Sequence, residues 1–145
     1  MTQQSHFNQA TADYICEQLA DGRSLRKIIR EDDGMPALST VFKWLNDHPG
    51  FSDQYTRARE IQAETLVDQI IEISDDGAND YMEKRAADGG MDGWRENGEA
   101  IARSRLRVDA RKWVAAKMAP KKYSDKVVQE LVGKDGGPIE VAHTA

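Results

Sequence analysis

One long amphipathic segment, from Phe51 to about Ser74, limits the possible folds of this chain more than any other feature. Its apolar residues recur at the three- and four-residue spacing of an α-helix, and Val67 and Ile71 widen the apolar stripe. The stripe consists of Phe51, Tyr55, Ala58, Ile61, Leu66, Ile70 and Ile73. At 1.5 Å per residue such a helix extends roughly 35 Å, further than a small neighbouring unit can cover. The sequence therefore predicts a mainly α-helical protein in which the far end of this helix needs packing partners.

Two short helices are predicted before the long one, in the stretch from Ser24 to Leu45. Ser24 can cap the first helix, and residues 34–36, which contain glycine and proline, break it. We expect Ser39 or Thr40 to open the second helix. Two short helices joined by a turn that contains glycine form the helix-turn-helix pattern, which places its second helix in the major groove of DNA. A helical hairpin packed only for stability gives the same pattern, so this stretch alone leaves both interpretations open.

Polar and basic residues of this stretch are the candidate DNA contacts. Three polar residues lie on the face that the second helix would present, and basic residues of the first helix could bind phosphates beside it. The predicted DNA-binding residues are Arg23, Arg26, Lys27, Arg30, Ser39, Thr40 and Lys43. The alternative is that the basic residues only cover a solvated face.

A helix over residues 9–20 is expected to complete a three-helix unit, preceded by a loose arm over residues 1–8. The predicted core of the unit is Ile15, Leu19, Leu25, Ile28, Ile29, Val41, Trp44 and Leu45. Trp44 could instead contact DNA, but its aliphatic neighbours favour the core. Cys16, the single cysteine, is expected to face the same core, and a chain with one cysteine fits a reducing compartment.

Residues 75–98 are expected to be largely irregular, because five glycines and frequent acidic residues interrupt them. A short helix around Tyr81–Ala87 is the one element that we consider there. The acidic run at the start of the segment lacks the alternation, central glycine and terminal glutamate of an EF-hand loop. A solvated acidic loop is therefore favoured over a calcium site.

A second strong helix is predicted from residue 99 to residue 118. Its expected apolar face consists of Leu106, Ala110, Trp113 and Val114. Arg103, Arg107 and Arg111 form a basic stripe, and the long helix carries a matching acidic row. The acidic row consists of Glu60, Glu64, Asp68 and Glu72. We expect the two rows to pair, within one chain or between copies, and DNA contact by the basic stripe is the alternative.

The C-terminal region is expected to form a β-hairpin. Lys126–Val132 is rich in strand formers, Pro138–Val141 is a possible second strand, and residues 133–137 read as a turn between them. We find no other strand pattern in the chain, and a single short hairpin is marginally stable in water. These strands would therefore need copies from other chains, and a ring of copies could close them into a barrel without exposed edges.

The net charge of −5 does not favour nucleic-acid binding, because phosphate repels an acidic protein. The charge is uneven, however, with −2 over residues 1–50, −8 over residues 51–100 and +5 over residues 101–145. The N-terminus has no signal-peptide pattern, and no apolar run approaches the ~20 residues that span a membrane. We expect a soluble cytoplasmic protein with no membrane partner.

No residue pattern predicts catalysis. The histidines, His6, His48 and His143, have no neighbours at ligand spacing, and Cys16 has no obvious histidine partner. The glycine-lysine pair in residues 133–137 lacks the spacing of a phosphate-binding loop. We therefore expect a protein that is not an enzyme, has no metal site and needs no cofactor.

Several separate stretches match one known family in the same order along the chain. In the C-terminal half these are Arg105-Leu106-Arg107-Val108-Asp109, Arg111-Lys112-Trp113, Pro120–Tyr123 and Leu131–Gly137. In the N-terminal half they are Gly34-Met35-Pro36, Ser39–Leu45 and the pair Phe51 and Tyr55. With these stretches, most of residues 10–137 resembles the terminase small subunits of tailed double-stranded DNA bacteriophages. Residues 77–100 look longer and richer in glycine than is usual in that family.

The resemblance implies a ring of about eight to ten copies in the host bacterial cytoplasm. It implies an N-terminal helix-turn-helix DNA-binding domain over residues 1–50 and a central helical oligomerisation domain over residues 51–120. Residues 121–145 would contribute a short β-hairpin to an intersubunit β-barrel. It further implies a non-catalytic protein that recognises the packaging start site on viral DNA and recruits and regulates the large terminase subunit, an ATPase and nuclease.

A dimeric helix-turn-helix transcriptional regulator is the alternative. It would bind a palindromic site as a dimer, because the two-fold symmetry of such proteins matches the symmetry of their operators. It would not need the C-terminal strands.

Overall fold

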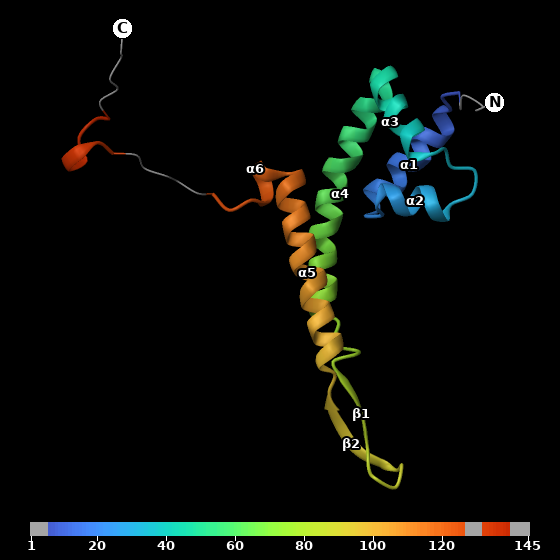
Figure 1. Ribbon diagram of the computed structural model, residues 1–145, viewed down its shortest axis with the longest axis vertical. Helices are drawn as coiled ribbons and strands as arrows, with labels where there is room; N and C mark the ends of the chain where they lie inside the picture. The colour runs from blue at the N-terminus through green and yellow to red at the C-terminus, as the bar shows by residue number, and fades with distance from the viewer. Residues whose placement is uncertain (1–5, 127–131, 140–145) are drawn as a thin grey trace.

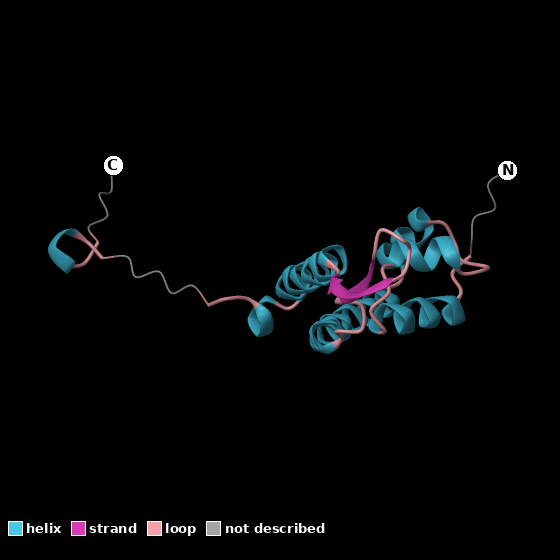
Figure 2. Ribbon diagram, turned by 90° about the horizontal axis from the view of Figure 1, so that it is seen from below, coloured by secondary structure: helices cyan, strands magenta, loops and turns pink. Residues whose placement is uncertain are grey.

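The computed structural model describes residues 6–126 and 132–139 (Figure 1). The elements follow in the order α1 (Gln9–Ala20), α2 (Leu25–Glu31), α3 (Leu38–Asp47), α4 (Pro49–Asp75), β1 (Tyr81–Arg85), β2 (Met91–Glu96), α5 (Gly98–Met118), α6 (Pro120–Tyr123) and a short 3-10 turn, η1 (Lys134–Gly136). Figures 1 and 2 show α1–α3, which we call the head, beside the upper part of α4, and α5 beside its lower part. The predicted mainly α-helical fold is confirmed.

The core of the head forms between α1, α2, α3 and the start of α4. Ile15, Leu19, Ile28 and Val41 have no exposed surface, and Trp44 is 3% exposed, so Trp44 is a core residue as expected. Leu25 is also buried, while Ile29 and Leu45 are partly buried against the cluster. The sequence-based core, with Cys16 facing it, is therefore confirmed, and the structure adds Ala12, Phe51 and Ala58.

Residues 6–8 do not behave as a free arm. The ring of Phe7 stacks on His48 with 4.0 Å between the ring centroids and meets Trp44 edge-on. Asn8 caps α1 by accepting a hydrogen bond from the amide of Thr11. These contacts attach the N-terminal end of the head to the joint between α3 and α4.

The starts of α2 and α3 differ in how they are capped. Ser24 accepts a hydrogen bond from the amide of Lys27, as the sequence predicted for α2. The expectation that Ser39 or Thr40 opens α3 is wrong, because the helix begins at Leu38 after an uncapped Ala37. Leu38 packs against the core, which favours helical backbone from that residue onward.

An ion pair fixes the two ends of α2. The Arg23 guanidinium donates to both oxygens of Asp32 at 2.7 and 2.8 Å, and the Tyr14 hydroxyl donates to Oδ2 of Asp32 at 2.8 Å. These hydrogen bonds, that of Arg23 first, lower the pKa of the Asp32 carboxyl. The contact joins α1, the loop before α2 and the residue that ends α2.

The head is held directly on α4. Only His48 lies between α3 and α4, and Pro49 starts the new helix. Farther along α4, the Gln62 side-chain amide donates to the carbonyl of Arg23 at 2.8 Å, and the Thr65 hydroxyl donates to the carbonyl of Ala20 at 2.7 Å. The turn between α1 and α2 therefore rests on the middle of the long helix.

Gly22 allows this close approach. Its φ angle is +93°, and a Cβ atom at this position would lie 2.7 Å from Nε2 of Gln69 and 3.3 Å from the Thr65 methyl group. Gln69 cannot move away freely, because its Oε1 accepts a hydrogen bond from Nε of Arg111 at 2.8 Å. Both the backbone conformation and the lack of space therefore require glycine here.

The predicted apolar face of α5 is largely exposed to solvent. Leu106 and Trp113 are 69% and 64% exposed, whereas Ala115 on another side of the helix is fully buried. Because α5 carries apolar residues on two sides, the sequence pattern does not decide which side faces α4. Arg111 also faces α4, through its bond to Gln69.

The expected pairing of acidic and basic rows does not form within the chain. Arg103 pairs with Glu99 of its own helix at 2.6 Å, and Arg111 binds the neutral Gln69. In the acidic row, Glu64 pairs with Lys122 instead, at 2.5 Å. The members of the two rows therefore make no ion pairs with one another among the described residues.

The segment between α4 and α5 forms a two-stranded antiparallel hairpin. The expectation of a short helix around Tyr81–Ala87 is therefore wrong. The expectation that no strands form outside the C-terminal region is wrong as well. Tyr81 pairs with Glu96, and Arg85 pairs with Met91. Asp88 and the two glycines after it make the turn: Gly89 has a φ angle of +84°, and Oδ1 of Asp88 accepts from the amide of Gly90. Every residue of both strands is exposed.

Most of the C-terminal strand prediction lies outside the described residues, since these end at residue 126 and resume only over residues 132–139. The expected turn is present as η1, where Asp135 has a φ angle of +58° and the amide of Gly136 donates to the carbonyl of Gly133.

We predict that Asp32→Asn lowers the melting temperature at neutral pH but not in acid. A carboxyl with a lowered pKa stabilises the folded state above its unfolded pKa of about 4, and this contribution disappears as the pH falls below that value. Thermal melts followed by circular dichroism between pH 6 and pH 2.5 should show that the difference in melting temperature between wild type and variant disappears below about pH 4. Asp33→Asn is the control, because Asp33 makes no ion pair among the described residues. A difference in melting temperature that stays constant with pH would show that the ionised Asp32 carboxyl is not the stabilising group.

We predict that Gly22→Ala lowers the free energy of unfolding by about 1–3 kcal/mol, through backbone strain and the clash with Gln69. Gly34→Ala separates the two causes, because Gly34 also has a positive φ angle, of +74°, but has no atom near its missing side chain. Chemical denaturation should rank Gly22→Ala as the more destabilised of the two. Equal losses would show that the contact with α4 adds nothing.

Candidate nucleic-acid interface

The outer face of α3 presents polar and aromatic side chains to solvent. Val41 and Trp44 turn one side of the helix into the core. Ser39, Lys43 and Asn46 follow one another at helical spacing on the opposite side, and all are exposed. Thr40 lies at the edge of this face and is half-buried. The second helix of the predicted pair therefore presents Ser39 and Lys43 as expected.

Phe42 is a residue that the sequence reading counted only as part of the apolar pattern. It is 53% exposed at the other edge of the same face. An exposed aromatic ring beside polar residues can contact a thymine methyl group or a sugar, whereas it adds nothing to the core. The signal in the sequence is its position three residues after Ser39, which places it away from Val41 and Trp44.

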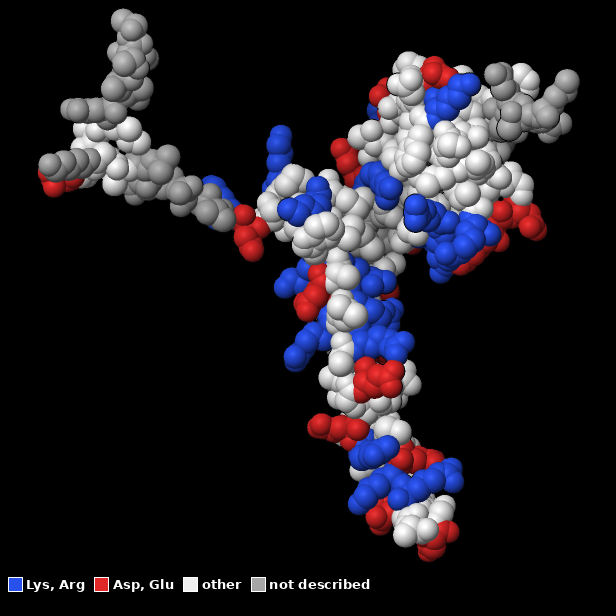
Figure 3. Space-filling model, in the orientation of Figure 1, with Lys and Arg blue, Asp and Glu red and all other residues white. Residues whose placement is uncertain are grey.

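Three of the predicted basic residues lie together on α2. Arg26, Lys27 and Arg30 are exposed, and Arg30 also contacts Glu31 at 3.1 Å. Figure 3 shows basic side chains gathered over α2 at the lower edge of the head, with acidic side chains close beside them. Electrostatic attraction to phosphate by this group is therefore partly cancelled by its neighbours.

Arg23 differs from the other predicted contacts. Its side chain is only 26% exposed, and its guanidinium donates to Asp32 and to Gln18. Hydrogen bonding to Asp32 raises its pKa. Arg23 therefore positions α2 and has few donors left for a phosphate.

Comparison with known proteins identifies the family. Residues 7–130 match the family model described as bacteriophage Sf6, terminase small subunit-like. The chain belongs to this family of phage terminase small subunits. Crystal structures of mutant forms of the terminase small subunit gp1 of the bacterial virus Sf6 have 40% sequence identity with it and TM-scores of 0.67 and 0.65. Each alignment covers 97% of this chain and 95% of the other. No curated protein matches.

The family resemblance predicted from the sequence motifs is therefore confirmed, and so is the fold of a terminase small subunit. The interface on α3 falls inside the matched residues. Among the residues that the structure describes, no helix is long and apolar enough to cross a membrane.

Groups with catalytic potential are few in this terminase small subunit. Within residues 6–126 and 132–139, no three His, Cys, Asp or Glu side chains come together as a metal site would require. The Cys16 thiol is buried, and burial raises its pKa to about 11, which keeps it protonated and unreactive at neutral pH.

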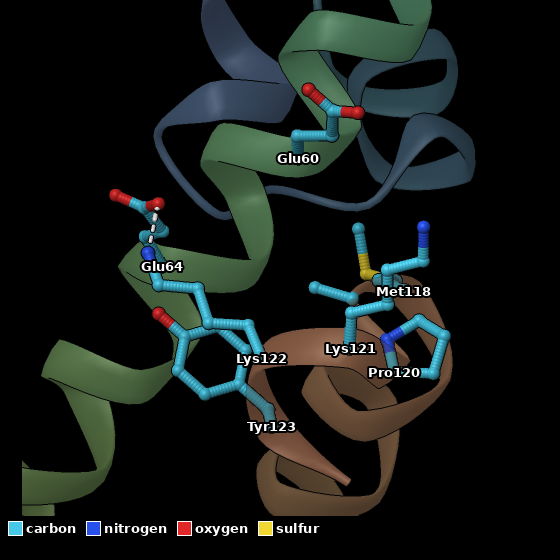
Figure 4. Close-up of a pocket in the computed structure, with 8 residues that line it drawn as sticks. Glu60, Glu64, Met118, Pro120, Lys121, Lys122 and Tyr123 are labelled. Atoms are coloured by element: carbon cyan, nitrogen blue, oxygen red, sulfur yellow. Dashed lines mark hydrogen bonds and ion pairs between the residues drawn. The ribbon is translucent and has the colours of Figure 1, made fainter.

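One open groove of about 470 Å³ lies between α4 and the turn from α5 to α6 (Figure 4). It is lined by Glu60, Glu64, Met118, Ala119, Pro120, Lys121, Lys122 and Tyr123. The hydrogen bond from Lys122 to Glu64 crosses one side of it and raises the pKa of Lys122. This contact positions α6 against α4.

Proposed function

We propose that this terminase small subunit recognises the packaging start site on viral DNA through the outer face of α3 and recruits the large terminase subunit to it. The observation that carries the proposal is the exposed face of Ser39, Phe42, Lys43 and Asn46 in a helix-turn-helix unit of a terminase small subunit. Hydroxyl, amide and ammonium groups at helical spacing can reach base edges in the major groove.

Arg26, Lys27 and Arg30 would contact phosphates and orient α3, because contacts to the DNA backbone position a protein without reading sequence. We leave Arg23 out of this interface, since its guanidinium is bound by Asp32. Thr40 stays at its edge as a supporting contact. The interface that we propose therefore consists of α3 residues that read bases and α2 residues that bind the backbone.

Binding by one copy should be weak, because few basic residues serve the interface on a chain of net charge −5. A ring of about eight to ten copies would supply avidity, since linked sites bind as one multivalent surface. In this arrangement residues 1–50 form the DNA-binding domain, residues 51–120 the oligomerisation domain and residues 121–145 an intersubunit barrel.

The large subunit would supply the ATPase and nuclease activities, and this chain would have no catalytic role. The setting for both is the cytoplasm of the bacterial host. We base this part of the proposal on membership of the family, and its direct test is co-purification of the two subunits in the presence and absence of packaging-site DNA.

We predict that Lys43→Ala and Phe42→Ala each lower the affinity for packaging-site DNA by about 5- to 150-fold, which corresponds to about 1–3 kcal/mol for the loss of one base contact. Fluorescence anisotropy at fixed salt, with scrambled DNA beside the viral site, measures the effect. Lys84→Ala is the matched control, because Lys84 is exposed but lies on the hairpin, away from the head. Unchanged affinity in both α3 variants would contradict the proposal.

We predict a different result for the double variant Arg26→Ala/Lys27→Ala. The double variant should bind viral DNA and scrambled DNA more weakly by the same factor, because phosphate contacts do not read sequence. It should also reduce the slope of log affinity against log salt concentration, because fewer counterions are released on binding. Its melting temperature should stay unchanged, whereas Arg23→Ala should melt earlier. A loss confined to the viral site would place these residues at base edges instead.

A further inference from the structure

A hollow of about 290 Å³ lies at the junction between the head and the two long helices. The turn between α1 and α2 forms one wall with Gly22 and Ser24, and α4 and α5 form the others. Two arginines line the hollow, Arg59 from α4 and Arg111 from α5, and none of the residues that line it is a carboxylate. Two cations therefore share one hollow whose walls supply no negative charge.

Both guanidinium groups belong to half-buried residues, and neutral acceptors hold them in place. Arg59 donates to the Tyr55 hydroxyl at 2.9 Å and to Oε1 of Gln62 at 2.7 Å. Arg111 donates to Oε1 of Gln69 at 2.8 Å and to a backbone carbonyl of its own helix at 3.3 Å. These hydrogen bonds fix the positions of the two groups without neutralising their charges.

The cost of the uncompensated charge is evident at Arg111. Burial first, and the charge of the nearby Arg107 second, lower the pKa of Arg111. Arg23 is the opposite case, because its hydrogen bond to Asp32 raises its pKa. A cation that loses water without gaining a counter-ion is destabilised, and an anion in contact with it removes that cost. The hollow therefore favours an anion.

Hydrogen-bond donors remain available around the hollow. A guanidinium has more N–H groups than the bonds described above use, and its planar fork matches the oxygens of phosphate-type anions. On the facing wall, the Ser24 oxygen accepts a hydrogen bond from the amide of Lys27, which leaves the hydroxyl hydrogen to donate. The donors thus come from three different elements and surround one space.

We infer that this junction hollow is a binding site for a phosphate-type oxyanion, held by Arg59 and Arg111 with the Ser24 hydroxyl as an additional donor. The site is separate from the proposed α3 interface and does not depend on it. Because α4, α5 and the turn before α2 all contribute, a bound oxyanion would tie the head to both long helices.

Two sources carry this chemistry, a phosphate of a DNA backbone and a free phosphate or nucleotide. Ser24 directly precedes α2, whose exposed Arg26 and Lys27 are the proposed backbone contacts. Figure 3 shows basic side chains on the lower edge of the head and on the α4–α5 pair beneath it, on the same face of the molecule. A duplex that ran under the head would pass this hollow, so the experiment must separate it from a free anion.

Thermal unfolding in phosphate tests the site on the full-length protein. When sodium phosphate replaces sodium chloride at constant ionic strength, the melting temperature should rise to a plateau, because a ligand that binds the folded state stabilises it by mass action. In Arg59→Gln/Arg111→Gln the same rise should need at least about tenfold more phosphate, because hydrogen bonds from charged groups are lost. The matched control is Arg57→Gln/Arg105→Gln, which removes the same charge from exposed positions of the same helices and should keep the wild-type rise.

A charge-conserving variant covers the case in which the glutamine variant does not fold. Arg59→Lys/Arg111→Lys keeps both charges but loses the planar fork, so it should bind phosphate more weakly than wild type does. Far-UV circular dichroism establishes which variants are folded. A higher phosphate concentration at half-saturation in the lysine variant supports the site, and an unchanged one overturns it.

Fluorescence anisotropy with scrambled DNA separates the two sources. If a DNA phosphate occupies the hollow, Arg59→Gln/Arg111→Gln should bind DNA more weakly and lower the slope of log affinity against log salt concentration by about 1. Unchanged DNA binding beside a lost phosphate response would assign the site to a free phosphate or nucleotide.

Two results would overturn the site itself. The first is an equal rise in melting temperature in wild type and all variants, because phosphate also stabilises proteins by exclusion from their surface. The second is a wild-type protein that does not respond to phosphate, beside a glutamine variant whose oligomer changes size in native mass spectrometry. That result would show that an acidic group of another copy neutralises the two arginines.

Discussion

Contact between the turn after α1 and the middle of α4 holds the rest of this structure in place. The carbonyls of Ala20 and Arg23 accept hydrogen bonds from Thr65 and Gln62, and Gly22 lets the two backbones approach. The same stretch of α4 positions α5, because Gln69 lies against Gly22 and also binds Arg111. The head and the two-helix stalk therefore share one junction, and neither can shift without breaking hydrogen bonds that involve buried or half-buried groups.

This junction divides the protein into two regions, the head on one side and the α4–α5 pair on the other. Above it, the Arg23–Asp32 pair sets α2, and the core under α3 turns Ser39 and Lys43 outward. Below it, α4 and α5 cover each other on one side only, which leaves acidic and basic outer faces. The proposed DNA-binding face is compatible with an acidic net charge in this way, because the charges around it are local.

Periodicity made much of the fold predictable. The helices, the Ser24 cap and most of the head core follow from apolar spacing, since one side of each helix is clearly apolar. The face of α5 could not be predicted, because it carries apolar residues on two sides and only the packing of Ala115 decides between them. The hairpin was missed because all its residues are exposed, which removes the alternation of apolar and polar residues, and its turn signal at Asp88 and Gly89 is short. Phe42 was counted only as part of the apolar pattern, although its position three residues after Ser39 already places it away from Val41 and Trp44.

The single residue between α3 and α4 limits how α3 can be oriented relative to α4. Because His48 is the whole connection and Phe7 stacks on it, the direction of α3 is tied to that of α4. In the proposed ring, the α3 helices of neighbouring copies would therefore stand at a fixed spacing, and a duplex that met several of them would have to curve. Bending costs depend on base sequence, with pyrimidine–purine steps bending most easily. Selection of a start site would then include the flexibility of base pairs that no side chain touches.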